Sequence, residues 1–233
     1  MEREQGSEGM FSRLPIVVWA VVAPMIAMEL VIGLAGLGIV GGAEGGFWRI
    51  EAIQRFAFLP ELARLMAETG AWTEGGAVRF LSYPFVHRGL IDAVFMVALT
   101  LALGKVAGEA LGSTGFMAVF FGAAIAGGAA AAFVLTGVEA LIGGFPAAYG
   151  LIGAFTFLLW ARLGQLGGPR ARAFGLIGML VGLQIVFGLA LGGLAGLAGL
   201  VPDLAGFAAG FVLAPFFVPG GMARIVAALR RRG

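Results

Sequence analysis

The sequence predicts an all-α, polytopic membrane protein with six transmembrane helices in a single domain over residues 1–233. Hydrophobic residues make up 60% of the chain and charged residues only 12%, and the mean hydropathy is +1.00. Soluble domains of this length do not have such a composition. The 41 glycines lie within apolar runs, as expected where membrane helices pack closely. We therefore expect an integral, multi-pass protein of the inner or plasma membrane if the source is bacterial.

The first predicted span covers residues 14–40 and follows a polar N-terminal tail at 1–13. A spanning helix needs roughly 20 mostly apolar residues, and this run is too long for a signal peptide and lacks a cleavage site. Glu29 lies in the middle of it. Because ionisable groups are costly inside a bilayer, Glu29 is expected either to form an internal hydrogen bond, which we favour, or to contact another membrane subunit.

A polar stretch at 43–84 separates this span from the next and contains four arginines and five glutamates around an apolar pattern. The apolar residues recur at helical spacing and are Ile50, Ile53, Phe56, Phe58, Leu62, Leu65 and Met66. This pattern predicts an amphipathic first loop that lies on the membrane interface, and not a span.

Five more apolar runs follow the first loop, which brings the predicted number of spans to six. They cover residues 85–104, 114–136, 141–161, 173–195 and 199–219. The breaks between them fall at 105–113, around Glu139, at 162–172 and in the glycine-rich approach to Pro202. The last break is weak, so the stretch 173–219 could also be divided differently.

The positive charges predict the orientation of the chain. Ten basic residues fall on one side of a six-span arrangement: Arg3, Arg13, Lys105, Arg162, Arg170, Arg172, Arg224, Arg230, Arg231 and Arg232. Because positive loops stay on the cytoplasmic side, both termini are predicted to be cytoplasmic, including the basic C-terminal tail at 220–233.

Several site types are excluded or disfavoured by composition. The chain has no cysteine, and His87 is its only histidine, which leaves no ligand set for a zinc site. No glycine-rich nucleotide-binding motif is present. The pI near 9.7 comes mostly from arginines in loops and tails and indicates membrane orientation and not nucleic-acid binding. We expect no metal, cofactor or nucleotide.

Four segments resemble the rhomboid family of intramembrane serine proteases, in family order and on the expected helices. They are RFLSYPFVH from Arg79, GKVAGEALG ending at Gly112, GGFPAAYGLIGAF from Gly143, and DLAGFAAG from Asp203. Together they cover roughly residues 79 to 215. The resemblance implies a six-helix rhomboid-like bundle. The retained positions would serve its scaffold, and they are Arg79, His87, Glu109, Gly112, Gly150, Gly153, Gly206 and Gly210.

The chemistry of the family is missing at the aligned positions. Its serine nucleophile aligns with Phe145 and its general base with Asp203, and two positions near the oxyanion align with Asp92 and Met96. The only serines are Ser7, Ser12, Ser82 and Ser113, so none lies in the fourth span. Loss of a nucleophile or its base reduces hydrolase rates by a factor on the order of 10⁶. We therefore expect no serine peptidase activity.

The retained scaffold and lost dyad resemble the pseudoproteases of the family, which bind transmembrane segments of client proteins as chaperones, adaptors or complex subunits. The candidate pocket comprises Asp92, Phe145, Tyr149 and Asp203, with Phe145 and Tyr149 filling the former active site. Membrane proteins and lipids are the expected partners.

Three alternatives stay open. Asp92 and Asp203 could form an aspartyl protease dyad, although the Tyr-Asp and Gly-x-Gly-Asp signatures of such enzymes are absent. They could instead line a polar pocket for a client or a lipid headgroup, or be hydrogen-bonded and silent. The chain could also be an accessory subunit or assembly factor of a larger complex; a transporter is less favoured because intramembrane charge is scarce.

Overall fold

The computed structural model describes residues 14–134 and 140–221, and within these ranges the protein is helical, with one isolated β-bridge between Phe58 and Leu141. The fold class is thus all-α, as predicted. The two predicted tails, with their arginines, and the predicted break around Glu139 lie outside the described residues, apart from residues 220 and 221.

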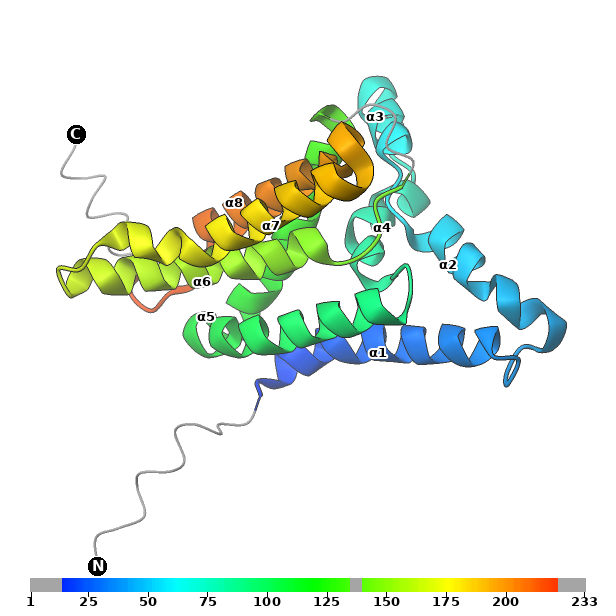
Figure 1. Cartoon of the computed structure of the whole chain (residues 1–233), viewed down its shortest axis with the longest axis horizontal. Coiled ribbons are helices and arrows are strands. Elements are labelled where there is room, and N and C mark those ends of the chain that lie inside the picture. The colour runs from blue at the N-terminus through cyan, green and yellow to red at the C-terminus, as the bar shows by residue number, and fades with distance from the viewer. Residues whose placement is uncertain (1–13, 135–139, 222–233) are drawn as a thin grey trace, which may run out of the picture.

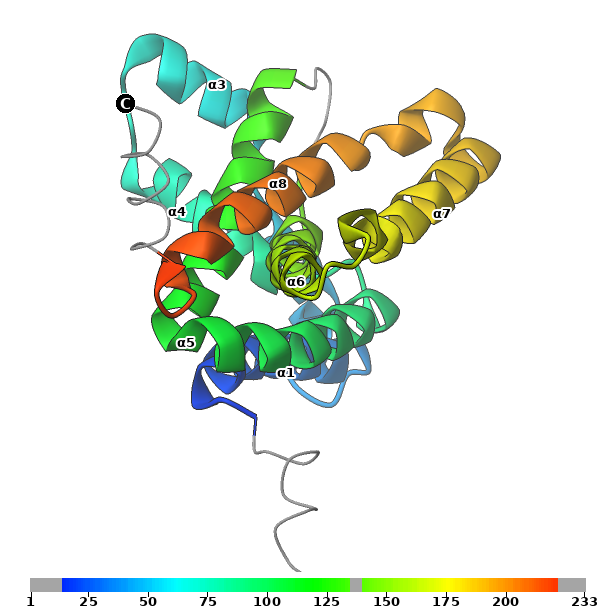
Figure 2. The same ribbon diagram turned by 90° about the vertical axis from the view of Figure 1, so that its left-hand side faces the viewer.

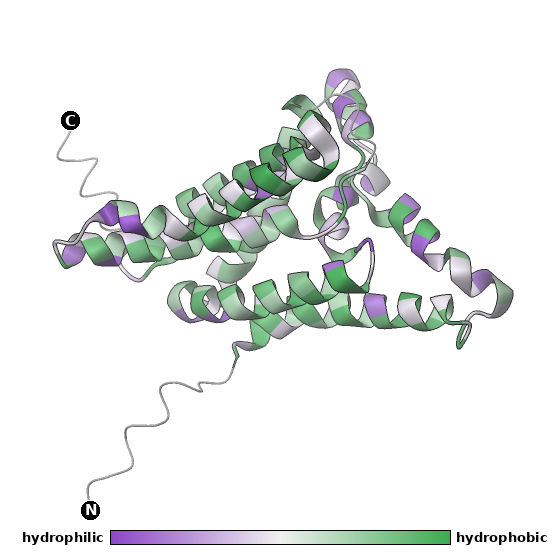
Figure 3. Ribbon diagram, in the orientation of Figure 1, coloured by the Kyte–Doolittle hydropathy of each residue, from purple (hydrophilic) through white to green (hydrophobic). Residues whose placement is uncertain are grey.

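Five of the described helices are long and apolar enough to cross a membrane. They are α1 (Ile16–Gly36), α5 (Leu90–Val134), α6 (Phe145–Gln165), α7 (Gly175–Gly192) and α8 (Leu200–Phe217). Figure 1 shows α1 beside the first half of α5, with α6, α7 and α8 on the other side of the molecule. Hydrophobic residues run along these helices, and polar residues gather at the ends of the bundle (Figure 3).

α5 is 45 residues long and replaces two predicted spans. The predicted break over nine residues, 105–113, is wrong, because the helix continues through all of them except Gly112. At Gly112 φ is 72° and ψ is 176°. Five of the nine residues in this stretch are alanine, leucine, lysine or glutamate, which are good helix formers. Only glycine takes this left-handed φ without steric strain, so the turn is confined to one residue.

The other helix boundaries differ from the predicted spans by a few residues. The second predicted span begins at Leu90 and not at residue 85, since residues 83–85 form a 3-10 turn, η2 (Tyr83–Phe85), around Pro84. The weak break before α8 is confirmed: η4 (Gly193–Leu197) separates α7 from α8. It begins at Gly193, whose φ is 58°.

The N-terminal half of α6 lies at the centre of the bundle, in contact with α5 and α8, and Figure 2 shows the helix end-on between them. Four glycines bring α6 and α8 into backbone contact. A Cβ on Gly206 would meet the carbonyl oxygen of Pro146, and one on Gly210 would meet that of Gly150. Gly153 faces the Phe207 carbonyl in the same way. Small residues of this kind allow the closest approach of membrane helices.

The first loop folds into short helices at one end of the bundle: η1 (Gly42–Phe47), α2 (Trp48–Phe56), α3 (Pro60–Thr69) and α4 (Glu74–Ser82). Its side chains attach it to the bundle through carbonyl groups. The guanidinium of Arg64 donates twice to the Ala132 carbonyl near the end of α5, at 2.7 and 3.0 Å. The Tyr83 hydroxyl donates to the Ala124 carbonyl at 2.8 Å. Ala132 is in the last turn of α5, where the helix leaves carbonyl groups open, so the Arg64 bonds also satisfy one of them.

Candidate functional site

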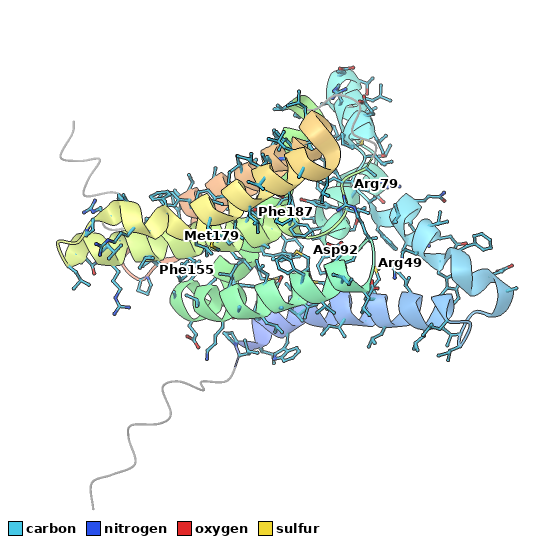
Figure 4. The ribbon with its side chains drawn as sticks, viewed as in Figure 1. Arg49, Arg79, Asp92, Phe155, Met179 and Phe187 are labelled. Carbon is cyan, nitrogen blue, oxygen red and sulfur yellow. The ribbon has the colours of Figure 1, made fainter. Side chains whose placement is uncertain are left out.

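Three of the predicted pocket residues lie where helices begin. Asp92 is in the first turn of α5, Phe145 is the first residue of α6, and Asp203 is in the first turn of α8. In Figure 4, Asp92 lies at the end of the bundle occupied by the first loop, near Arg49 and Arg79. Helix starts from three distant parts of the sequence therefore share one end of the molecule.

A groove of about 210 Å³ lies between α5, α6 and α7. Its lining is apolar apart from Tyr149 and Gln184. The lining residues are Phe95, Leu99, Phe145, Ala148, Tyr149, Ile152, Leu180, Leu183, Gln184 and Phe187. Of these residues, Phe187 of α7 is labelled in Figure 4. We call this feature the α5–α7 groove.

A second, more open depression of about 690 Å³ adjoins the α5–α7 groove and is lined by Arg88, Asp92 and neighbouring residues of α5. Phe95 and Phe145 line both. Their rings stack with centroids 6.1 Å apart and an interplanar angle of 30°. Phe145, at the predicted nucleophile position, thus bridges α6 to α5 with an aromatic ring and offers no hydroxyl.

The remaining aligned positions near Phe145 are closely packed. Met96 is completely buried, and its methyl group lies against Gly144, the residue before α6. Tyr149 is 6% exposed and lies one turn further along α6. No described serine lies in α6; Ser82 is in α4 and donates to the Phe56 carbonyl at 2.9 Å.

Asp203 is buried and belongs to a chain of hydrogen bonds that joins three helices. The Tyr149 hydroxyl donates to Oε1 of Gln184 at 2.9 Å, and Nε2 of Gln184 donates to Oδ2 of Asp203 at 2.7 Å. The chain runs from α6 through α7 to α8. The sequence did not predict this chain of hydrogen bonds, and the only signal for it was the presence of three polar residues in apolar spans.

Asp92 has a different environment. Its Oδ2 accepts a hydrogen bond from the backbone amide of Arg88 at 3.1 Å, just before α5 begins. Such carboxylates satisfy open amides at helix starts. No described hydrogen bond joins Asp92 to Asp203, and the two carboxylates bind different partners.

Glu29 lies against Arg49 of the first loop. The two guanidinium nitrogens of Arg49 donate to the two carboxylate oxygens at 2.8 and 3.1 Å, and one also donates to the His87 carbonyl at 2.9 Å. Sequence reasoning missed Arg49 as a site residue. A carboxylate inside a span requires a partner, and Arg49 is the first basic residue after that span, so a signal was present.

The predicted scaffold residues are spread over the first loop and the helix contacts. Arg79 donates to the carbonyls of Ala57 and Gln54, at 2.6 and 2.8 Å, and so closes the end of α2. Glu109 is on the exposed face of α5, three residues before the turn at Gly112.

His87 is 2% exposed in the loop that precedes α5. Neither ring nitrogen has a hydrogen-bond partner among the described residues. Burial lowers the pKa of His87 below its ordinary range, while the negative charges of Asp92 and Glu29 act in the opposite direction. Burial thus favours the neutral imidazole, and no described hydrogen bond joins its ring to a serine.

No group of three or more metal-ligating side chains occurs within residues 14–134 and 140–221. The Rhomboid domain family matches residues 74–220, which is more than half of the chain. No curated protein matches the chain significantly. The match covers α4 to α8 and therefore the whole of the α5–α7 groove.

Proposed function

The chain belongs to the rhomboid family, and we propose that this integral, multi-pass membrane protein binds a transmembrane segment of a partner protein in the α5–α7 groove without cleaving it. The observation that carries the proposal is the groove itself. It is lined almost entirely by apolar and aromatic side chains and contains two polar groups, those of Tyr149 and Gln184. The surface of a transmembrane helix is likewise mostly apolar with a few polar groups, so it matches this lining.

The weak packing of α7 supports access from the lipid. Only 6% of its most apolar stretch is buried inside the protein, compared with 50% for α6. Ile177 is the only buried residue among those described in α7. A helix with so few neighbours can move aside for a guest at little energetic expense.

The lost nucleophile supports binding without cleavage. Phe145 and Pro146 begin α6 where the family has its serine and glycine. Thr156, the only serine or threonine in that helix, is three turns deeper and fully buried. Acyl transfer needs a nucleophile within about 3 Å of its base, and His87, the only histidine, is not part of the groove lining.

We infer six crossings, with α5 providing two of them. A straight helix of 45 residues would be about 67 Å long, twice the roughly 30 Å of the hydrocarbon core, so the turn at Gly112 divides it into two spans. Arg162, Arg170 and Arg172 lie at the end opposite the first loop, where α6 leads into α7. The positive-inside rule assigns that end to the cytoplasm and the first loop to the other side.

Photocrosslinking from the groove tests the proposal. A benzophenone amino acid replaces Phe187, which lines the groove, or Leu191, which is 86% exposed four residues later on the same helix and is not part of the lining. We expect the Phe187 probe to yield adducts that map to a membrane-spanning segment of a protein, and the Leu191 probe to yield none. Adducts with lipid alone, or equal adducts from both positions, would contradict the proposal.

Cleavage assays separate this function from an Asp92–Asp203 protease. We expect a single-span protein captured at Phe187 to stay intact when it is reconstituted with the chain. Cleavage that disappears with Asp203→Asn would instead establish the aspartyl mechanism. A protein that copurifies in fixed ratio without groove adducts would indicate an accessory subunit.

A further inference from the structure

A second apolar groove, of about 370 Å³, lies between α1 and the first half of α5. Apart from Glu29, every residue that lines it is apolar; the lining includes Met25, Leu30, Leu90, Val97 and Leu101. None of the residues that line the α5–α7 groove takes part. The two grooves therefore lie on different faces of α5, and we call the second one the α1–α5 groove.

The α1–α5 groove is closed at its deep end by contact between the two helices. A Cβ on Gly104 would lie 3.0 Å from Cγ1 of Val18, and one on Gly108 would lie 2.9 Å from Cγ of Pro15. Along α5 the groove runs from Leu90, the first residue of the helix, to Leu101, just before this contact. At 1.5 Å per residue this is about 16 Å, or half of the roughly 30 Å hydrocarbon core. The groove thus has the depth of one leaflet, on the side of the first loop.

The width of the α1–α5 groove fits a hydrocarbon chain better than a helix. Its volume divided by this length gives a mean cross-section of about 22 Å². A helix with its side chains is about 10–12 Å in diameter and needs roughly 80 Å² or more. A helix would also cross both leaflets and continue past the end of the groove. An extended acyl chain of one leaflet has both the right length and the right width.

Arg49 marks the shallow end of the α1–α5 groove. It binds Glu29, which lines the groove, and the carbonyl of His87, three residues before Leu90. Figure 4 labels Arg49 at the end of the molecule occupied by the first loop. A guanidinium has five N–H donors, and the described bonds of Arg49 account for three. Its side chain is 26% exposed, so the remaining donors can reach an acceptor at the membrane surface.

We propose that the α1–α5 groove binds one acyl chain of a phospholipid from the leaflet on the first-loop side, with the lipid phosphate accepting hydrogen bonds from Arg49. Guanidinium groups are well suited to phosphate oxygens. Because Glu29 already balances the charge of Arg49, a zwitterionic headgroup suits this end. Leu30 and Val94 at the groove are 58% and 59% exposed, so the chain enters sideways from the bilayer. This lipid site goes beyond the proposed function and does not depend on it.

A photoreactive phosphatidylethanolamine with a diazirine in the middle of one acyl chain tests the site. The protein is reconstituted in vesicles of unlabelled phosphatidylethanolamine and phosphatidylglycerol with a small fraction of this probe, and the adducts are mapped by peptide mass spectrometry. We expect adducts concentrated on the groove residues of α1 and α5. Ala98→Phe, which fills the groove, should lose them. Ala27→Phe, at an exposed position of α1 outside the lining, is the matched control and should keep them.

Adducts spread over all lipid-facing helices, including the exposed α7, would overturn the site, and this readout needs no variant if Ala98→Phe does not fold. Equal labelling of the groove by the matching diacylglycerol, which has no phosphate, would overturn the role of Arg49. Groove adducts that form only after a copurifying membrane protein is removed would assign the groove to that protein and not to lipid.

Discussion

Glu29 and Glu61 each pair with an arginine, but the side chain of Glu29 is buried and that of Glu61 is exposed. The side chain of Glu29 is 8% exposed and binds Arg49 through two hydrogen bonds, whereas that of Glu61 is 62% exposed and pairs with Arg64 on the surface of α3. Exposed pairs contribute little to stability. A buried charge that loses its partner is much more costly.

We expect Glu29→Ala to lower the free energy of unfolding by about 1–3 kcal/mol, because the Arg49 donors lose their acceptors. Glu61→Ala should change it little. Thermal unfolding of the two variants in the same detergent compares them directly. Equal melting temperatures for the two variants would show that the Glu29–Arg49 pair does not hold the first loop to α1.

His87 makes a second prediction, which concerns pH. Its folded-state pKa is lowered by burial, whereas the unfolded chain takes up a proton near the ordinary value of about 6.5. The unfolded state then binds more protons below that value. The stability that neutral His87 provides is therefore complete above about pH 6.5 and is lost as the pH falls.

The melting temperature of the native protein should decrease between pH 7.5 and 5 more steeply than that of a His87→Gln variant, which cannot titrate there. Because His87 is the only histidine, no second imidazole contributes to the difference. Parallel curves for the two proteins would rule out a buried neutral imidazole.

The sequence indicated which residues were unusual but not which partners they have. Glu29 and Asp203 were identified because carboxylates are rare in apolar spans. Their partners, Arg49 and Gln184, are 20 and 19 residues away, and such pairings depend on how the helices pack. Hydropathy and spacing carry no information about that packing, so the hydrogen bonds that join Tyr149, Gln184 and Asp203 could be recognised only in the structure.

At the scale of the helices, the backbone of α5 departs from helical geometry at a single residue, Gly112. The sequence predicted a nine-residue break, because Lys105 and Glu109 are charged. Both residues are good helix formers with long side chains, and they leave the helix intact. Hydropathy therefore located the apolar helices, while their ends depended on backbone conformation at single residues such as Gly112 and Gly193.

The close contact between α6 and α8 is possible only because glycine has no side chain. A third prediction follows from it. A methyl group on Gly206 would collide with the Pro146 carbonyl, whereas one on Gly182 of α7 would meet nothing within 4 Å. We expect Gly206→Ala to destabilise the protein by about 1–3 kcal/mol through overpacking. Gly182→Ala should be neutral or stabilising, since alanine is the better helix former.

Thermal unfolding of the two alanine variants in one detergent measures this difference. A Gly206→Ala protein as stable as Gly182→Ala would mean that α6 and α8 are not in backbone contact.

At the scale of the whole molecule, closely packed and loosely packed helices are separated. α5, α6 and α8 form a core with close contacts, and the side chains of Arg64 and Tyr83 fix the first loop to α5 of this core. α7 is the least buried of the five spanning helices. The α5–α7 groove lies between the core and this helix, beside the position where the family has its nucleophile and this chain has Phe145.

The central claim, binding of a transmembrane segment without cleavage, is tested most directly by one measurement. The protein with a benzophenone at Phe187 is reconstituted with a single-span guest that has a different tag at each end, and the photoadduct is weighed by mass spectrometry. The account predicts an adduct that contains the full-length guest with both tags. An adduct that contains only one tag, or two released fragments of the guest, would contradict it.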